Sequence, residues 1–189
     1  MKTELKILRH LIEHKKHLTV RQLSKNIGSD YKISHTAIQR LIKKELLTAE
    51  TVGKAKVVRL TNKFTKDVFD VEFERRMEIL NNKNLDVAIK TIKENVACVN
   101  FIILLFGSYA KHKQRKHSDI DIMFIIPDKS LEKKIKEAIS LIPLKLHPLI
   151  LTEEEFVNMK NTTQPNVVHE VMENNVILSG IEQYYELIK

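Results

Sequence analysis

Apolar residues in the first sixty positions recur every three or four residues, and then give way to two short β-forming segments. This change of spacing predicts helices followed by a hairpin. The expected segments are three helices at residues 3–14, 19–28 and 34–46, and two strands at 47–52 and 55–60. Thr19 and Ser34 are the expected N-caps of the second and third helices, and Gly53-Lys54 is the expected turn. Residues 1–62 therefore form a first module.

A polar, charged stretch follows, and beyond it strands alternate with helices. Residues 62–82 carry an apolar stripe made of Phe64, Val68, Phe69, Phe73, Met77 and Leu80. This stripe predicts a linker helix over 63–84 that suits packing on a second subunit. Further helices are expected at 85–96, 131–141, from Thr152, at 167–173 and at 181–188, with strands at 99–106, 120–126, 144–151 and 176–178. This pattern predicts an α+β domain over 85–189, a mixed sheet flanked by helices.

Composition excludes several classes of protein. The chain has 189 residues, 43% of them hydrophobic and 30% charged, which is typical of a soluble globular protein. Its longest apolar run, residues 99–106, is too short to span a bilayer, and residues 1–16 lack the apolar core of a signal peptide. Cys98 is the single cysteine, so no internal disulfide can form. We therefore expect a cytoplasmic protein without a membrane partner.

Positive charge is concentrated in the first module. Residues 1–62 hold 14 Lys and Arg against 5 Asp and Glu, whereas residues 63–189 hold 18 against 19. Such asymmetry indicates a module that meets a polyanion. Three helices, a hairpin and this charge resemble a winged helix-turn-helix DNA-binding domain.

That resemblance makes the third helix the recognition helix and the hairpin the wing. The residues expected to contact DNA are Arg21, His35, Gln39, Arg40 and Lys43, with Lys54 and Lys56 on the wing. Gln and Arg can hydrogen-bond to base edges, and Lys meets phosphate. A protein-interaction or dimerisation module with a solvated basic face is the alternative.

The residues that carry chemistry lie in the second module. Gly107-Ser108 follows an apolar strand, where a glycine admits close approach of a ligand and free backbone N–H groups attract anions. Asp119 and Asp121 come ten residues later, and residues two apart on a strand share a face. Two neighbouring carboxylates repel unless a cation lies between them, and Mg²⁺ prefers such oxygen ligands.

The segment LLFGSYAKHKQRKHSDIDIMFI resembles the signature of the DNA polymerase β-like nucleotidyltransferases, and more narrowly of their minimal bacterial and archaeal members. The resemblance extends over roughly residues 85–189. It implies that Gly107 and Ser108 hold a nucleoside triphosphate (NTP) and that Asp119 and Asp121 bind Mg²⁺ or Mn²⁺. Lys111, in the basic loop between the motif halves, could reach phosphate; a solvated loop is the alternative.

The third carboxylate that this family usually supplies from a later strand is missing. The matching segment, residues 144–151, holds no acid, and His147 stands about where the acid is expected. A neutral histidine can act as a base or a metal ligand, or it can simply be solvated.

Two functions remain open from the sequence. One is an enzyme that transfers a nucleoside monophosphate to a hydroxyl of a protein, an RNA or a small molecule. A variant of it is an antitoxin-type transferase acting on a HEPN-domain ribonuclease partner. The other is a non-catalytic transcriptional regulator that binds DNA and senses a nucleotide through a degenerate site. A homodimer is compatible with either.

Overall fold

The computed structural model describes residues 2–97, 101–111, 113 and 118–189, and it divides the chain into two compact units. One unit spans Met1–Val71 and the other Glu72–Ile188. Helix α4 (Lys66–Leu80) contains the boundary, so the chain passes from one unit to the next within a single helix. No helix in the described ranges is both long and apolar enough to cross a bilayer.

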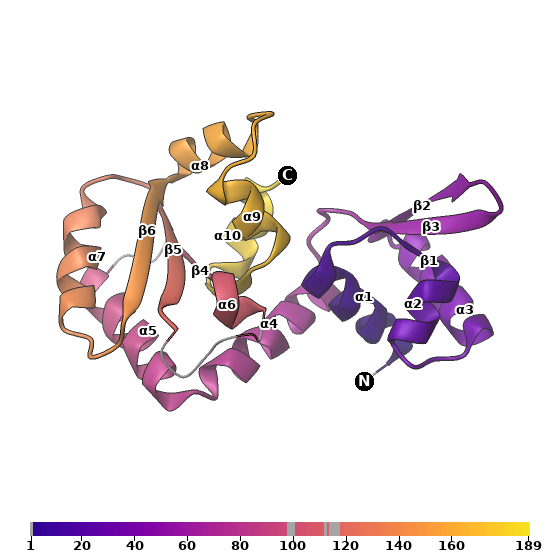
Figure 1. Ribbon diagram of the computed structural model, residues 1–189, viewed down its shortest axis with the longest axis horizontal. Helices are drawn as coiled ribbons and strands as arrows, with labels where there is room; N and C mark the ends of the chain where they lie inside the picture. The colour runs from indigo at the N-terminus through magenta and orange to yellow at the C-terminus, as the bar shows by residue number, and fades with distance from the viewer. Residues whose placement is uncertain (1, 98–100, 112, 114–117) are drawn as a thin grey trace. The chain divides into compact units, whose positions relative to one another are not determined.

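The N-terminal unit consists of three helices and a small antiparallel sheet (Figure 1). Its elements are α1 (Thr3–His14), β1 (Leu18–Thr19), α2 (Val20–Asn26), α3 (Tyr31–Lys43), β2 (Leu47–Val52) and β3 (Ala55–Leu60). The strand order is β1-β3-β2, and β2 and β3 form the expected hairpin about Gly53. Strand β1 was not predicted, because two residues are too few to show an alternating pattern.

The helix caps were predicted in part. Thr19 is the N-cap of α2, as expected, and it also forms a capping box with Gln22. The Gln22 N–H donates to Thr19 Oγ1 at 3.2 Å, and Gln22 Oε1 accepts from the Thr19 N–H at 2.9 Å. The predicted start of the third helix at Ser34 is wrong. Asp30 caps α3 by accepting the Lys32 N–H at 2.8 Å, and Ser34 lies fully buried one turn inside the helix.

The C-terminal unit is built on a four-stranded mixed sheet, as predicted. Its strands are β4 (Ile102–Leu105), β5 (Ile120–Ile126), β6 (Leu146–Thr152) and β7 (Val176–Ser179), in the order β6-β5-β4-β7. Strand β4 runs antiparallel to β5 and β7, whereas β5 and β6 are parallel. The expected strand start at Leu144 moves to Leu146, and Val99 and Asn100 of the predicted first strand lie outside the described residues.

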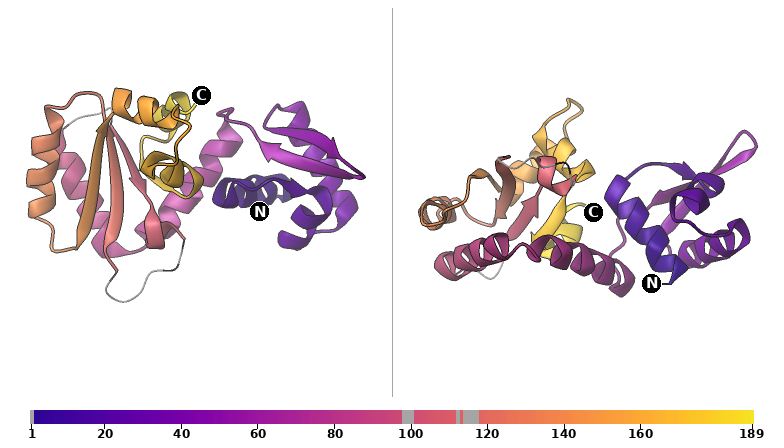
Figure 2. Two further views of the ribbon diagram at one scale, coloured as in Figure 1. Left: turned by 45° about the horizontal axis from the view of Figure 1, so that its top comes forward. Right: turned by 60° about the horizontal axis from the view of Figure 1, so that its bottom comes forward.

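Helices cover both faces of this sheet (Figures 1 and 2). Helices α5 (Lys83–Val96) and α7 (Leu131–Ser140) lie on one side, and α8 (Glu153–Lys160), α9 (Val167–Glu173) and α10 (Ile181–Leu187) on the other. Ile120, Ile122 and Phe124 pack with the apolar residues of α5 and α7. Since side chains alternate along a strand, Asp121 belongs to the face opposite α5 and α7.

The buried face of α4 agrees with the predicted apolar stripe at Val68, which is 2% exposed, but differs from it further along the helix. Phe73 and Met77 are 40% and 45% exposed, whereas Glu72 and Arg75 are 1% and 6% exposed. Arg75 Nη1 pairs with Glu72 Oε2 at 2.5 Å, the Tyr185 hydroxyl donates to Glu72 Oε1 at 3.0 Å, and Arg75 Nη2 donates to the Asn175 carbonyl at 2.7 Å. Burial, and secondarily the Glu72 carboxylate, raises the pKa of Tyr185 well above its usual value. Buried charges are tolerated here because they are paired and hydrogen-bonded.

Candidate functional site

The turn after β4 is shaped by Gly107. This residue opens the short helix α6 (Gly107–Ala110) with φ +67°, in the left-handed region that favours glycine. A Cβ atom at this position would lie 2.1 Å from Asp121 Oδ2 and 3.0 Å from Asp121 Cγ. The Asp121 carboxylate therefore fills the space that any other side chain at position 107 would need.

Strand β5 holds Asp121 against this turn. The Phe106 N–H donates to the Asp121 carbonyl at 3.0 Å, which fixes the end of β4 beside β5. The Asp121 side chain is 28% exposed. The expectation that both acids are strand residues is correct for Asp121 only, because β5 begins at Ile120 and Asp119 is an exposed residue just before it.

Strand β6 places His147 beside Asp121. The two residues are paired in the parallel register of β5 and β6. His147 Nδ1 lies 3.1 Å from Asp121 Oδ1, and the histidine side chain is 76% exposed. The sequence located His147 near the position of a missing acid, but only the pairing of β5 with β6 brings it to Asp121.

Ser108 and Lys111 follow Gly107 in the same segment of the motif. Ser108 is half-buried in α6. Lys111 is exposed, with Nζ 3.5 Å from Glu170 Oε1 of α9, a partner 59 residues away that the sequence did not indicate. His112, Arg115, Lys116 and His117 of the basic loop lie outside the described residues.

The donor atoms of this site fit a divalent cation that also binds phosphate. The described residues contain no group of three or more His, Cys, Asp or Glu side chains that could hold a metal ion by themselves. Mg²⁺ sites that act on nucleotides commonly use one or two carboxylates and complete their coordination with water and substrate phosphates. Asp121 and Asp119, with only Ile120 between them, suit that arrangement.

Comparison with protein families decides the class. The family model described as polymerase beta, nucleotidyltransferase matches residues 87–183, just over half of the chain. The chain belongs to the polymerase beta nucleotidyltransferase family. The matched residues run from α5 to α10 of this nucleotidyltransferase domain and include Gly107, Asp121 and His147. Comparison with curated proteins and with solved structures gives no significant match.

A second candidate surface lies outside the nucleotidyltransferase domain, on α3 and the β2–β3 hairpin. The residues expected to contact DNA are mostly exposed: Arg21, Arg40, Lys43, Lys54 and Lys56 are exposed, and His35 and Gln39 are half-buried. Starting α3 at Tyr31 adds Tyr31 and Ile33, which are 52% and 56% exposed, to its outer surface. The sequence signal for them was Asp30, a strong N-cap residue that the prediction overlooked.

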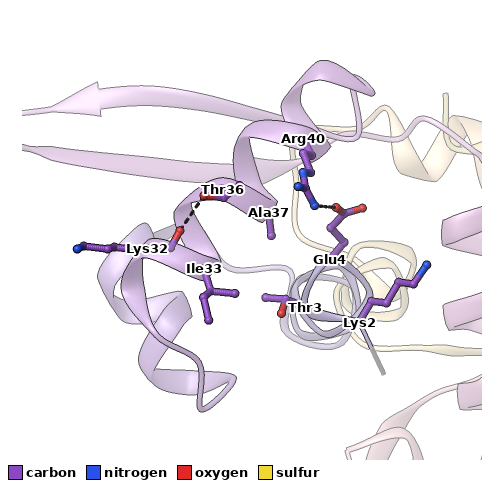
Figure 3. Close-up of a pocket in the computed structure, with 8 residues that line it drawn as sticks. All are labelled: Lys2, Thr3, Glu4, Lys32, Ile33, Thr36, Ala37 and Arg40. Carbon is purple, nitrogen blue, oxygen red and sulfur yellow. Dashed lines mark hydrogen bonds and ion pairs between the residues drawn. The ribbon is translucent and has the colours of Figure 1, made fainter.

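An acidic partner accompanies the cations of α3. Arg40 Nη1 and Lys44 Nζ each lie 3.4 Å from a Glu4 carboxylate oxygen at the start of α1. Glu4 and Arg40 meet across an open groove of about 560 Å³ whose lining also includes Lys2, Lys32 and Ile33 (Figure 3). Lys44 also bonds to Asp67 at 2.7 Å, and this carboxylate raises the pKa of Lys44. The sequence could not indicate the Glu4–Arg40 pair, since 36 residues separate them.

Proposed function

We propose that the protein is an active nucleotidyltransferase that transfers a nucleoside monophosphate from an NTP to a hydroxyl acceptor. The observation that carries this proposal is the contact between Gly107 and Asp121. The Asp121 carboxylate occupies the space that a Cβ at position 107 would need, which sets the proposed phosphate-binding turn directly against the proposed metal-binding strand. Such fixed geometry between binding groups is what positions reacting atoms for in-line attack.

Each motif residue then has a chemical task. The backbone N–H groups of α6 and the Ser108 hydroxyl bind the triphosphate, with Lys111 as an additional cation beside the phosphates. Asp119 and Asp121 hold the divalent ion, which when bound supplies Lewis-acid stabilisation of phosphate charge. The acceptor oxygen forms a bond to the α-phosphorus, the bond from that phosphorus to the bridging oxygen breaks, and pyrophosphate leaves. The acceptor proton passes to a base or to water.

The direct test is turnover. The full chain would be incubated with each α-labelled NTP, Mg²⁺ or Mn²⁺, and acceptors of three classes: RNA, small alcohols, and a HEPN-domain partner protein. Label transfer to any acceptor, with release of pyrophosphate, supports the enzyme. NTP binding without transfer to any of them would favour the non-catalytic nucleotide sensor instead.

Replacing both acids with their amides should greatly weaken metal-dependent NTP binding. Asp119→Asn with Asp121→Asn keeps the size of both side chains but removes the two carboxylates. Mg²⁺ at nucleotide sites is bound through such carboxylates together with the substrate phosphates. We expect the metal-dependent part of the affinity, measured by calorimetry, to fall by about a hundredfold, the upper range for loss of a metal-orienting partner. Asp86→Asn, at a half-buried acid of α5 that pairs with Lys90 at 2.7 Å, is the control and should leave binding unchanged. Unchanged metal dependence in the double variant would remove these acids from the site.

We also propose that the N-terminal unit binds duplex DNA as a winged helix-turn-helix, with α3 as the recognition helix. Support comes from the order of its elements and from the excess of 14 basic over 5 acidic residues in positions 1–62. Exposed Lys43, Lys54 and Lys56 suit phosphate contacts, and Gln39 and Arg40 suit base edges. Affinity that falls steeply with salt is the expected result, because phosphate contacts release counterions.

Glu4 is expected to weaken this interaction. In the absence of DNA its carboxylate lies 3.4 Å from Arg40 Nη1, so DNA phosphates and Glu4 compete for the same cation. Glu4→Gln should tighten DNA binding by up to about fivefold, since an exposed ion pair is worth at most about 1 kcal/mol. Fluorescence anisotropy across a salt series would measure this.

Glu13→Gln is the matched control for Glu4→Gln. Glu13 lies on the same helix and pairs with Arg9 at 2.8 Å, and its substitution changes the net charge by the same amount. An equal effect of the two substitutions would show that only net charge matters and that Arg40 is not a DNA contact. Salt-independent binding of the unsubstituted protein would contradict the DNA proposal as a whole.

A further inference from the structure

A histidine occupies the strand position next to Asp121, on the edge strand of the sheet. His147 on β6 is paired with Asp121 on β5, and both side chains lie on the face opposite α5 and α7. His147 Nδ1 and Asp121 Oδ1 are 3.1 Å apart. The described part of β6 contains no carboxylate, so a nitrogen donor stands where an oxygen donor would suit Mg²⁺ best.

The separation of these two donor atoms suits two ligands of one metal ion. Neighbouring ligands at right angles, each about 2.1 Å from an ion, lie about 3 Å apart. The Nδ1–Oδ1 distance of 3.1 Å agrees with this value. The same distance suits a simple hydrogen bond, in which His147 would only position the carboxylate. The distance alone therefore allows two roles for His147. It is either a ligand whose Nδ1 bonds the ion, or a residue that positions Asp121 without bonding the ion.

Exposure of the pair favours the ligand role. The His147 side chain is 76% exposed and Asp121 28%, so water and triphosphate oxygens have access to both donors. An orienting histidine is commonly held between two fixed groups, as in a triad in which a buried acid fixes the ring. No hydrogen bond fixes the second ring nitrogen of His147 among the described residues. The ring can therefore adjust to an ion, with its position set by the register of β6.

We propose that His147 is a metal ligand together with Asp121, and that it makes this site selective for divalent transition-metal ions over Mg²⁺. The inference rests on the proposed function in that it takes Asp121 as a ligand of the nucleotide-associated ion. Imidazole is a softer donor than carboxylate, and affinity for mixed nitrogen and oxygen sites rises along the first transition series. Mg²⁺ keeps its waters and prefers oxygen ligands, so its affinity gains little when His147 stands in the place of a carboxylate.

The test uses Mn²⁺, because its unpaired electrons report directly on a bonded nitrogen. The full chain would be loaded with Mn²⁺ and inorganic tripolyphosphate, which supplies phosphate oxygens without any choice of base. Electron spin-echo spectra should show coupling to one histidine nitrogen in the unsubstituted protein. His147→Asp should lose that coupling while still binding the ion.

Selectivity is the second measurement. The ratio of Co²⁺ to Mg²⁺ affinity, obtained by competition, should fall about tenfold in His147→Asp, because Co²⁺ stands above Mn²⁺ in the affinity series for nitrogen-containing sites. The added negative charge strengthens binding of both ions, and the ratio cancels that effect. Asp119→Asn is the companion variant: it weakens both ions but should keep the nitrogen coupling, since His147 is intact.

Three outcomes would overturn the inference: no nitrogen coupling in the unsubstituted protein, an unchanged affinity ratio in His147→Asp, or no binding of Mn²⁺ with tripolyphosphate. These outcomes are separate from failure of the proposed transfer reaction. Nitrogen coupling without turnover would support His147 as a ligand in a protein that only senses nucleotide. Turnover without coupling would support the enzyme and leave His147 as a positioning residue.

Discussion

Gly107→Ala should reduce metal-dependent NTP binding by about a hundredfold, the effect expected when a binding group is displaced by about 1 Å. The new methyl group would lie 2.1 Å from Asp121 Oδ2, well inside van der Waals contact, so the carboxylate has to move. The bond from the Phe106 N–H to the Asp121 carbonyl holds the backbone in place, so the movement falls on the carboxylate, which leaves its position beside His147 Nδ1. Calorimetric titration with NTP and Mn²⁺ measures the loss.

The control for Gly107→Ala is Gly53→Ala. Gly53 has nearly the same backbone conformation, with φ +61°, but a Cβ there would meet no atom within 4 Å. It therefore reports the cost of the left-handed conformation alone, about 1–2 kcal/mol, without a clash. Gly53→Ala should bind NTP like the unsubstituted protein. If Gly107→Ala also does so while remaining folded by circular dichroism, the turn and Asp121 are not parts of one binding site.

Glu72→Gln should destabilise the C-terminal unit by about 3–5 kcal/mol, the cost of leaving one member of a buried ion pair without its counter-charge. The substitution preserves the shape of the side chain but removes the negative charge opposite Arg75, which is only 6% exposed. The Tyr185 hydroxyl would still find an oxygen acceptor, so the loss reports the charge and not the hydrogen bond. Urea unfolding followed by circular dichroism measures the free energy of unfolding.

Glu132→Gln is the matched control for Glu72→Gln. Glu132 pairs with Lys136 at 2.6 Å on α7, four residues along the helix, and the side chains are 31% and 62% exposed. Its loss should cost about 0.5 kcal/mol or less. Similar small effects of Glu72→Gln and Glu132→Gln would contradict a structural role for the buried pair.

The buried pair of Glu72 and Arg75 also indicates that the C-terminal half of α4 belongs to the C-terminal unit. The family match begins at residue 87, after α4 has ended. Arg75 nevertheless bonds to the Asn175 carbonyl, and Glu72 to Tyr185, so the C-terminal half of α4 is fixed to segments about one hundred residues later. A nucleotidyltransferase fragment that begins at residue 85 would lack the Glu72 and Arg75 side chains, which bond to Tyr185 of α10 and to Asn175 between α9 and β7.

Much of the architecture followed from local patterns. Spacing of apolar residues located the helices and most strands to within a few residues, and the caps at Thr19 and Thr152 were predicted from adjacent residues. Predictions failed where two local signals competed. Ser34 was chosen as a cap over Asp30, and apolar Phe73 and Met77 were chosen as the buried face of α4 over Glu72 and Arg75. At the start of α3 the Asp30 carboxylate is the acceptor that forms the cap. In α4, Glu72 and Arg75 are buried because they bond to groups remote in sequence.

The sequence by itself determined the class of this protein and the identity of its motif, because Gly107-Ser108 and the acids at 119 and 121 are separated by one short segment between two apolar strands. Tertiary structure decided what touches them. The contact of Gly107 with Asp121 depends on the antiparallel pairing of β4 and β5, and the contact of His147 with Asp121 on the parallel pairing of β5 and β6. Glu4 with Arg40, and Glu72 with Tyr185, are likewise pairs between distant segments. Local pattern records which face of an element is apolar, but strand register and helix docking fix which distant polar groups meet.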